Sequence, residues 1–409
     1  MNRRLGNTLK RAKKLVYKNR NIFIAGLALI LVSLVLSLLR QEPSKEMQKA
    51  PDAQVVQEAS QSIELAMVGD MLPHDTVTNA AKSSEDYNYL DLISKGLQDS
   101  FKKADLHFCN QEAVSAASLP VDGYPAFNAP VAFPRDINRF GCDIISTANN
   151  HAADKGLEGI RGTLDVWDRL KPEAVSGMHK SSDEADKLQI VEKNGIKVGF
   201  TAFNEVNNIS PPTSETGINM LTDFKLLSEQ IKGLKQNADV VVVSVHWGKE
   251  DSHDLTSAQK EYAKQISDLG ADIIIGTGPH VWQPYQILDR DNGGKTYLWN
   301  SIGNGLNSQT KQDQLFSGVA LINISKNKDG KITIKDPRVL PTYMHYVWGS
   351  GVGTSQSQLL DRKDLKWGLL KCSQSELDKR NDFKTTEDEQ KSRLKQYLNN
   401  DKVQLIDSY

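Results

Sequence analysis

Side chains of the kinds that bind metal ions recur along this sequence of 409 residues, each time shortly after an apolar run. The apolar runs predict buried strands, so the polar groups stand where strands end. The residues in question are Asp70, His74, Asn110, Glu112, Asn149, Asn150, His151, His246, Glu250, His280 and Asn304. Because ligands bind at the carboxyl ends of strands in open α/β sheets, we expect these groups to converge on one site.

The donor types define the chemistry that such a site can do. Carboxylate oxygens, amide oxygens and imidazole nitrogens suit Mn, Zn or Fe. A carboxylate such as Glu112 can bridge two ions, and a pair of ions clamps a phosphoryl or acyl oxygen. His151, next to Asn150, suits a general acid that protonates a leaving group. The sequence therefore predicts a centre for one or two divalent ions.

Each of these residues also has an ordinary structural interpretation when it is taken alone. Asp70 follows a glycine, as turn residues often do, and Asn149 with Asn150 is typical of a loop or a helix cap. Trp247 can simply pack against His246, and His280 stands in a turn rich in Gly and Pro. The recurrence of such groups at successive strand ends, rather than any one of them, predicts a shared site.

The elements that must position the site alternate along residues 62–345, which we interpret as one domain. Strands are expected at 63–68, 105–110, 142–148, 238–247 and 271–277, and helices at 89–104, 157–170, 221–237 and 257–270. Asn194-Gly195 and Asp329-Gly330 indicate β-hairpins. This alternation predicts an α/β fold, a layered α/β sandwich with mixed β-sheets. Residues 346–409 form a charged C-terminal extension with one or two helices, which is typical of solvated surface and receives no chemistry.

The N-terminal segment predicts a membrane anchor. Residues 1–21 are basic, and no charged residue occurs from Ile22 to Leu39, a length close to that of a helix that crosses a bilayer. The basic flank predicts that residues 1–21 stay in the cytoplasm and that the main domain lies outside the cell. The run ends in SLLRQEPSK, which lacks the small-residue site of a cleaved signal peptide, so an uncleaved signal anchor fits better. The polar residues 40–61 read as a linker.

Charge and cysteine content narrow the partners. Residues 1–20 contain eight Lys or Arg and no acid, while the chain as a whole has 50 basic and 51 acidic residues, so the remainder is acidic. A basic head before a membrane span favours anionic lipid, and an acidic body argues against nucleic acid. Three cysteines give no disulfide framework. We expect Cys109 and Cys142 to be small buried hydrophobes, with a bridge between them left open.

Six stretches together resemble one family. They are VGDMLPHDTV, CNQEAV, TANNHAADKGLEG, VVVSVHWGKE, GADIIIGTGPHVWQP and NSIGNG, within residues 62–310. In this order they resemble the poly-γ-glutamate capsule biosynthesis proteins of the CapA/PgsA type, whose fold is similar to that of calcineurin-like metallophosphoesterases.

The resemblance implies roles for individual residues. The implied metal ligands are Asp70, Glu112, Asn150, His246 and His280, and the implied catalytic residue is His151. Five more residues are expected to contact substrate or to support the ligands: His74, Asn110, Asn149, Glu250 and Asn304.

This sequence departs from the family at two points. The family often has HPH in the loop of His280, where this chain has Gly278-Pro279-His280, so one imidazole is missing. NSIGNG continues as LNSQ, where aromatic and acidic residues are usual. The departures predict a weakened or absent second metal site, for which His74 could partly compensate.

The resemblance implies a membrane-anchored, extracellular component of poly-γ-glutamate capsule synthesis or export. Its expected partners are the synthase and export membrane complex, the anionic polymer and membrane lipid. The alternative is a metal-dependent hydrolase of the cell envelope that acts on a phosphoester or on the polymer. A phosphatase or nucleotidase unrelated to capsule would need residues that grip phosphate, and Lys155 and Arg161 are the only clear candidates at the strand ends.

Overall fold

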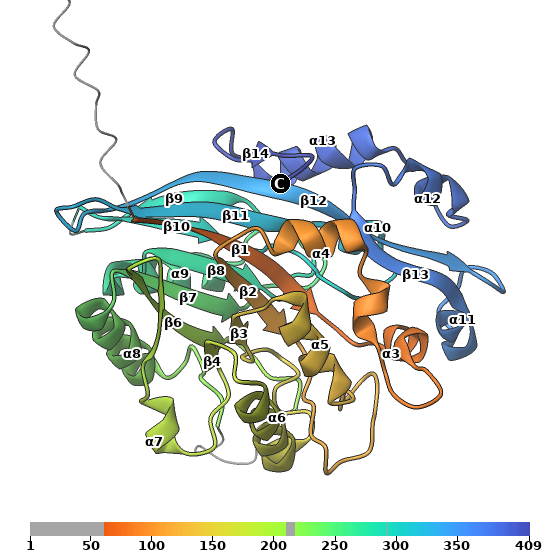
Figure 1. Cartoon of the computed structure of the whole chain (residues 1–409), viewed down its shortest axis with the longest axis horizontal. Helices are drawn as coiled ribbons and strands as arrows, with labels where there is room; N and C mark the ends of the chain where they lie inside the picture. The colour runs from red at the N-terminus through yellow and green to blue at the C-terminus, as the bar shows by residue number, and fades with distance from the viewer. Residues whose placement is uncertain (1–60, 210–216, 292) are drawn as a thin grey trace, which may run out of the picture. The chain divides into compact units, whose positions relative to one another are not determined.

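Two β-sheets packed face to face form the centre of the structure, a computed structural model (Figure 1). It describes residues 61–209, 217–291 and 293–409. The predicted tail, membrane span and most of the linker lie outside these ranges. Among the described helices, none has the length and apolar character that crossing a membrane requires.

The first sheet has eight strands and is parallel on one side and antiparallel on the other. Four neighbouring strands run parallel: β1 (Gln61–Met71), β2 (Leu106–Gln111), β3 (Ile144–Ser146) and β4 (Ala174–Ser176). On the other side of β1 the sheet continues antiparallel with β11 (Phe316–Lys326), β12 (Ile332–Trp348) and β13 (Arg362–Leu369). The short β14 (Gln404–Leu405) pairs with β12.

The second sheet has six strands, of which the inner four are parallel. These are β6 (Ile196–Asn204), β7 (Val240–His246), β8 (Ile273–Thr277) and β10 (Lys295–Trp299). The edge strands β5 (Gln189–Lys193) and β9 (Tyr285–Asp289) are antiparallel to their neighbours. The predicted α/β fold with mixed sheets is therefore confirmed.

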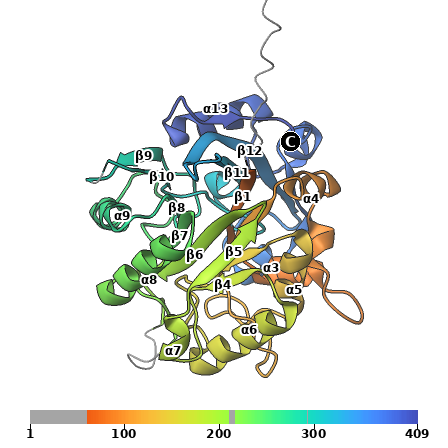
Figure 2. The same ribbon diagram turned by 60° about the vertical axis from the view of Figure 1, so that its left-hand side comes forward.

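Alternation along the strands explains the layers. Val240 and Val242 of β7 pack in the core between the sheets, whereas Val241 and Val243 pack in a second cluster on the other face. Successive side chains of a strand point to opposite faces, so an unbroken run of valines buries both. That second cluster is closed by α8 (Phe224–Asn237) and α9 (Ser257–Leu269), which Figures 1 and 2 show outside the second sheet.

Further helices cover the first sheet. Those on its outer face are α3 (Asp75–Ala81), the 3-10 helix η1 (Tyr89–Leu92), α4 (Lys95–Phe101) and α5 (Ala132–Phe140). After them come α6 (Gly156–Leu170), α7 (Ser182–Ala185), α10 (Gln312–Leu315), α11 (Gln356–Leu360), α12 (Gln374–Lys379) and α13 (Glu387–Leu398). Leu394 and Leu398 of α13 join the core between the sheets.

The expectations for the helix at 89–104 and for the C-terminal extension needed correction. The helix predicted at 89–104 is interrupted at Ile93, because the side chain of Ser94 accepts a hydrogen bond from the backbone N–H of Leu97 and caps a new helix. The boundary predicted before residue 346 falls inside β12, and the extension, expected to be solvated surface, supplies β13 and β14 to the first sheet. Both predicted hairpins are present.

The cysteines decide a question that the sequence left open. Cys109 and Cys142 are buried, as expected, and they form a disulfide with a Cα–Cα distance of 5.8 Å. Helix α5 carries the chain from β2 back to the neighbouring strand β3, which places Cys142 beside Cys109. Composition could not show this because it carries no information on which strands are neighbours. Cys372 is a free, exposed cysteine.

Candidate metal centre

The ends of parallel strands from both sheets meet at one place. Asp70 lies near the end of β1, Glu112 directly follows β2, and His246 is the last residue of β7. His280 and Asn304 stand in the loops after β8 and β10. A bridge between Asp70 and Asn304 joins β1 to the segment that follows β10, so the two sheets contact each other at this point.

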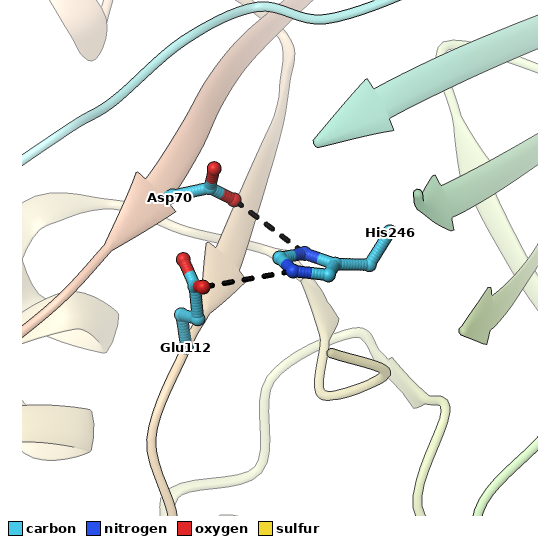
Figure 3. A group of neighbouring side chains, drawn as sticks. All are labelled: Asp70, Glu112 and His246. Carbon is cyan, nitrogen blue, oxygen red and sulfur yellow. Dashed lines mark ion pairs between the residues drawn. The ribbon is translucent and has the colours of Figure 1, made fainter. Parts of the chain in front are cut away.

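His246 lies between two buried carboxylates (Figure 3). Its Nδ1 is 3.8 Å from Asp70 Oδ1, and its Nε2 is 3.6 Å from Glu112 Oε1. One donor atom from each of these three residues lies within 4.8 Å of the other two. That spacing is small enough for the three groups to share one cation.

His280 completes the cluster. Its Nδ1 is 3.0 Å from Asp70 Oδ2 and 3.1 Å from Asn304 Oδ1, and its Nε2 is 3.7 Å from Glu112 Oε1. The backbone φ of His280 is 61°, a conformation that residues other than glycine seldom adopt. The backbone of His280 is therefore in a strained conformation, and such residues are concentrated at functional sites.

Asp70 and Glu112 are both fully buried but differ in their partners. Asp70 accepts hydrogen bonds from the backbone N–H of Gly278 (3.0 Å) and from Asn110 Nδ2 (2.8 Å), in addition to its contact with His280. Neither carboxylate oxygen of Glu112 has a hydrogen-bond partner in the described structure. The amide oxygen of Asn150 is likewise buried and unpartnered. Unpartnered buried acceptors are costly, so these oxygens fit a cation that they would bind.

The pKa values of the two carboxylates differ in the same way as their hydrogen bonding. Burial and then the charge of Asp70 raise the pKa of Glu112 well above its usual value. Burial would also raise the pKa of Asp70, but the hydrogen bond and charge of His280 outweigh it and the pKa is lowered. Burial lowers the pKa of His246 to about 4, so its imidazole is neutral at pH 7. Neutral imidazole is the form that binds metals.

The altered loop has a physical explanation. Gly278 has a φ of 106°, and a Cβ added there would come within 2.7 Å of the carbonyl oxygen of Trp247 and 3.2 Å of His246 Cδ2. The position is therefore built for a glycine whose N–H binds Asp70. An imaginary imidazole at residue 278 would need the backbone itself to move.

A second group of polar side chains surrounds His151. Its Nδ1 is 2.7 Å from Asp154 Oδ2, and the same oxygen accepts a hydrogen bond from the backbone N–H of Phe127 (2.7 Å). Its Nε2 is 3.4 Å from Asn208 Nδ2. The sequence indicated Asp154 only as a polar group at a strand end, without a specific role, and did not indicate Asn208. The three-residue spacing of His151 and Asp154 was an available signal, whereas Asn208 follows β6 without one.

The remaining predicted residues divide into two kinds. Asn110 and Asn304 contact Asp70 and His280, and Asn149 Nδ2 donates to the carbonyl oxygen of Gln111 (2.8 Å), which ties the loop after β3 to β2. His74 and Glu250 instead line a cavity beside the centre. In the described part of the chain, no hydrogen bond or ion pair joins either of them to a predicted ligand, and the Nδ1 atom of His74 is buried without a partner.

Two known proteins are similar to part of this chain. A Bacillus subtilis (strain 168) protein described as PGA biosynthesis protein CapA is 30% identical over 192 residues, or 47% of this chain and 49% of that protein. The capsule biosynthesis protein CapA of Bacillus anthracis is 30% identical over 173 residues, 41% of each chain. The chain thus spans about half the length of these curated relatives or less.

Two further comparisons concern the fold and the family. The NAD nucleotidase of Haemophilus influenzae superposes with a TM-score of 0.43 at 12% identity, over 86% of this chain and 58% of that one, a likeness too low to support a conclusion. The model of the family described as Bacterial capsule synthesis protein PGA_cap matches residues 64–309, which include every predicted site residue. The chain therefore belongs to the bacterial capsule synthesis protein family PGA_cap.

Proposed function

We propose that this protein is a membrane-anchored component of capsule synthesis that uses a divalent metal to cleave or transfer a bond of the capsule polymer. The observation that carries the proposal is Glu112, whose two oxygens are buried without hydrogen-bond partners and whose Oε1 is 3.6 Å and 3.7 Å from the nitrogens of two imidazoles. The sequence resemblance to proteins with a metallophosphoesterase-like fold supports it, because the same ligand types follow the strands.

The metal would be held by Asp70, Glu112, Asn150, His246 and His280, and Mn, Zn or Fe suits these donors. When bound, such an ion supplies Lewis-acid polarisation of a carbonyl or phosphoryl oxygen. The chain's own residues orient the reaction. The cluster around Asp70 fixes the imidazole of His280.

His151 would move the proton. Asp154 accepts from Nδ1 and so keeps a proton on that nitrogen. Nε2 is then left to exchange a proton with the leaving group, which is the role of a general acid or base. Asn208 is the only described side chain within hydrogen-bonding reach of Nε2.

Several features support the location of this activity outside the cell. The basic residues 1–20 before an apolar run predict a cytoplasmic N-terminus. The disulfide between Cys109 and Cys142 is of a kind that persists in oxidising compartments. We propose poly-γ-glutamate as the polymer and its synthase and export complex as the partner, because one relative is described as a PGA biosynthesis protein.

The altered loop favours a second candidate function. Because Gly278 offers only its backbone N–H, a two-metal centre would lack one imidazole ligand. The second candidate is a subunit that binds polymer for export and uses the ion for binding alone.

Metal content tests the proposal first. The full-length chain would be purified in detergent and measured by elemental mass spectrometry beside Glu112→Gln, with the exposed Glu192→Gln as the matched control. We expect roughly one equivalent of Mn, Zn or Fe, lost in the Glu112 variant and kept in the control. A wild-type chain that stays metal-free after reconstitution would refute the metal-dependent function.

Polymer cleavage then separates the two candidates. Poly-γ-glutamate incubated with the metal-loaded chain should shorten on gel filtration, and His151→Asn should slow this by roughly 10²–10⁴-fold while its metal content stays unchanged. A chain that holds metal and binds polymer without shortening it would instead support the export subunit.

A further inference from the structure

A cavity of about 610 Å³ lies beside the metal centre. His74 and Glu250 line it together with residues beyond the family match at 64–309, among them Lys311 and Arg362. Arg362 begins β13, which Figure 1 shows with α11 beside helix α3. The C-terminal part of the chain therefore completes a pocket that opens next to the candidate metal ligands.

Arg362 is a buried cation with neutral partners, and 7% of it is exposed. Its Nε donates to the carbonyl oxygen of Leu359 (2.8 Å), and one terminal nitrogen donates to the hydroxyls of Thr76 (2.9 Å) and Ser308 (3.3 Å). The other terminal nitrogen donates to the carbonyl oxygen of Ser308. No Asp or Glu of the described ranges forms an ion pair with it. Burial lowers the pKa of Arg362, which indicates a positive charge that its surroundings compensate poorly.

Arg380 shows how the same fold treats another buried arginine. Both guanidinium groups stack on the ring of Tyr346, with the carbon of Arg380 4.1 Å and that of Arg362 4.8 Å from its centroid. Arg380 is paired with the carboxylate of Asp382, to which its Nε donates at 2.8 Å. Buried charges are costly unless they are paired. The chain supplies an acid to Arg380 and none to Arg362, and of the two only Arg362 lines the cavity.

We propose that this cavity binds an anionic group of the substrate, a carboxylate or a phosphate, with Arg362 as its anchor. The inference rests on the proposed function in one respect, because it places the bond to be cleaved at the neighbouring metal centre. Four of the five N–H groups of the Arg362 guanidinium already donate to protein oxygens, so a bound anion would accept the remaining one and be held mainly by the positive charge. Stacking on Tyr346 and Trp348 fixes the guanidinium for this contact.

The charges of the other lining residues indicate where in the cavity an anionic group would bind. Asp75 and Glu250 lie on the cavity wall together with His74. Lys311 lines it too, but its ammonium group is already paired with Asp251. Of the cations that line the cavity, Lys311 is paired and Arg362 forms no ion pair with a described acid, so the anionic group is expected at Arg362. Arg362 thus acts as a specificity-determining residue that selects substrates carrying an anion.

Binding measurements on the full-length chain in detergent test this inference. The probes are a γ-linked glutamate trimer and inorganic phosphate, titrated by calorimetry with and without added metal. We expect at least one probe to bind the wild-type chain, and Arg362→Lys to bind it roughly tenfold more weakly, because lysine cannot keep the hydrogen bonds and the ring stacking that hold the charge at the cavity wall. Binding of the trimer would identify the anion at Arg362 as a carboxylate of the polymer, and binding of phosphate would identify it as a phosphoester group.

A second variant guards against a folding defect in the first. Ser308→Asp would place a carboxylate beside Arg362, because the Ser308 hydroxyl is 3.3 Å from the guanidinium. It should raise the melting temperature without ligand and abolish probe binding, whereas Ser308→Ala should do neither. Equal affinity in wild type, Arg362→Lys and Ser308→Asp, or no binding of either probe, would overturn the inference.

Metal content keeps the two proposals apart. Both variants should retain the metal of the wild-type chain, because Arg362 and Ser308 contact none of the candidate ligands. If the wild-type chain holds no metal but Arg362→Lys still loses probe binding, the proposed function is refuted and anion binding at Arg362 is supported. If the chain cleaves polymer equally well with Arg362→Lys, the proposed function is supported and anion binding at Arg362 is refuted.

Discussion

The Asp70 side and the Glu112 side of the candidate centre have equal burial and opposite environments. Asp70 is surrounded by three donors from two segments: Gly278 and His280 of the loop after β8, and Asn110 at the end of β2. Neither oxygen of Glu112 accepts a hydrogen bond in the described structure. The pKa is lowered for Asp70 and raised for Glu112 accordingly.

The difference shows which of the two carboxylates has its hydrogen bonds satisfied by the protein without a metal ion. Asp70 joins the two sheets and is satisfied without any ion, so it has a structural role that would persist in a protein without metal. Glu112 accepts no hydrogen bond that would offset its desolvation, so its carboxylate is the part of the site that fits a bound cation. A buried acid whose partners are missing is a stronger sign of a ligand site than a buried acid alone.

The largest expected effect comes from neutralising each acid in turn. Asp70→Asn should lower the free energy of unfolding of the metal-free protein by about 3–5 kcal/mol, because it removes the charged partner of a buried network. Glu112→Gln should leave it unchanged or raise it, since the lost carboxylate has no partner to strand. Denaturant unfolding in the presence of a chelator measures both values. Equal losses in the two variants would remove the distinction between the two sides.

The pH dependence of stability sharpens the same distinction. A carboxyl whose pKa is raised by folding stabilises the folded state fully below its unfolded pKa of 4.5, and this contribution is lost as pH rises through the folded value. The stability advantage of Glu112→Gln over the wild-type chain should therefore grow as pH rises above 4.5, in metal-free protein. Thermal unfolding from pH 4.5 to 8 tests it, and a constant difference would mean that the Glu112 pKa is not raised.

His246 gives an opposite and separable slope. Burial lowers its pKa from 6.5 to about 4, so the stability that it contributes is present above pH 6.5 and is lost as pH falls towards 4. In the metal-free Glu112→Gln variant this should reduce the free energy of unfolding by about 3 kcal/mol over that interval. Replacing His246 with Gln in the same background should flatten the slope; an unchanged slope would assign it to another group.

The sequence allowed the strand ends to be predicted because two local signals coincide there. Apolar runs such as that of β8 mark buried strands, and chain direction fixes which end carries the polar residues. These two signals were sufficient to predict that Asp70, Glu112, His246 and His280 converge on one site. The layered α/β fold followed from the same alternation.

What the sequence could not provide depends on contacts between distant segments. The contrast between Asp70 and Glu112 arises largely from the loop of Gly278 and His280, which lies 208–210 residues away from Asp70 and has positive φ at both residues. The disulfide depends on which strands are neighbours. The C-terminal extension looked like solvated surface because its charges are frequent, but Arg362 and Arg380 are buried on aromatic faces, which composition does not reveal.

The smallest expected effect tests whether the C-terminal helix α13 supports the satisfied side of the centre. Asp313 of α10 binds Arg393 and Tyr397 of α13 and lies 3.1 Å from His253 Nε2. The next residue of α10, Gln314, accepts a hydrogen bond at its carbonyl oxygen from Asn304 Nδ2 (3.1 Å), which turns Asn304 Oδ1 towards His280.

Because this chain of contacts ends on a candidate ligand, Asp313→Asn should weaken metal binding by roughly tenfold, the size expected when a group that orients a ligand is lost. The exposed Asp91→Asn is the control and should leave the affinity unchanged. Competition with a chromogenic chelator measures both. If Asp313→Asn lowers the melting temperature but leaves metal affinity at the wild-type value, α13 stabilises the fold alone, and the Asp70 side owes its geometry entirely to the segments before residue 309.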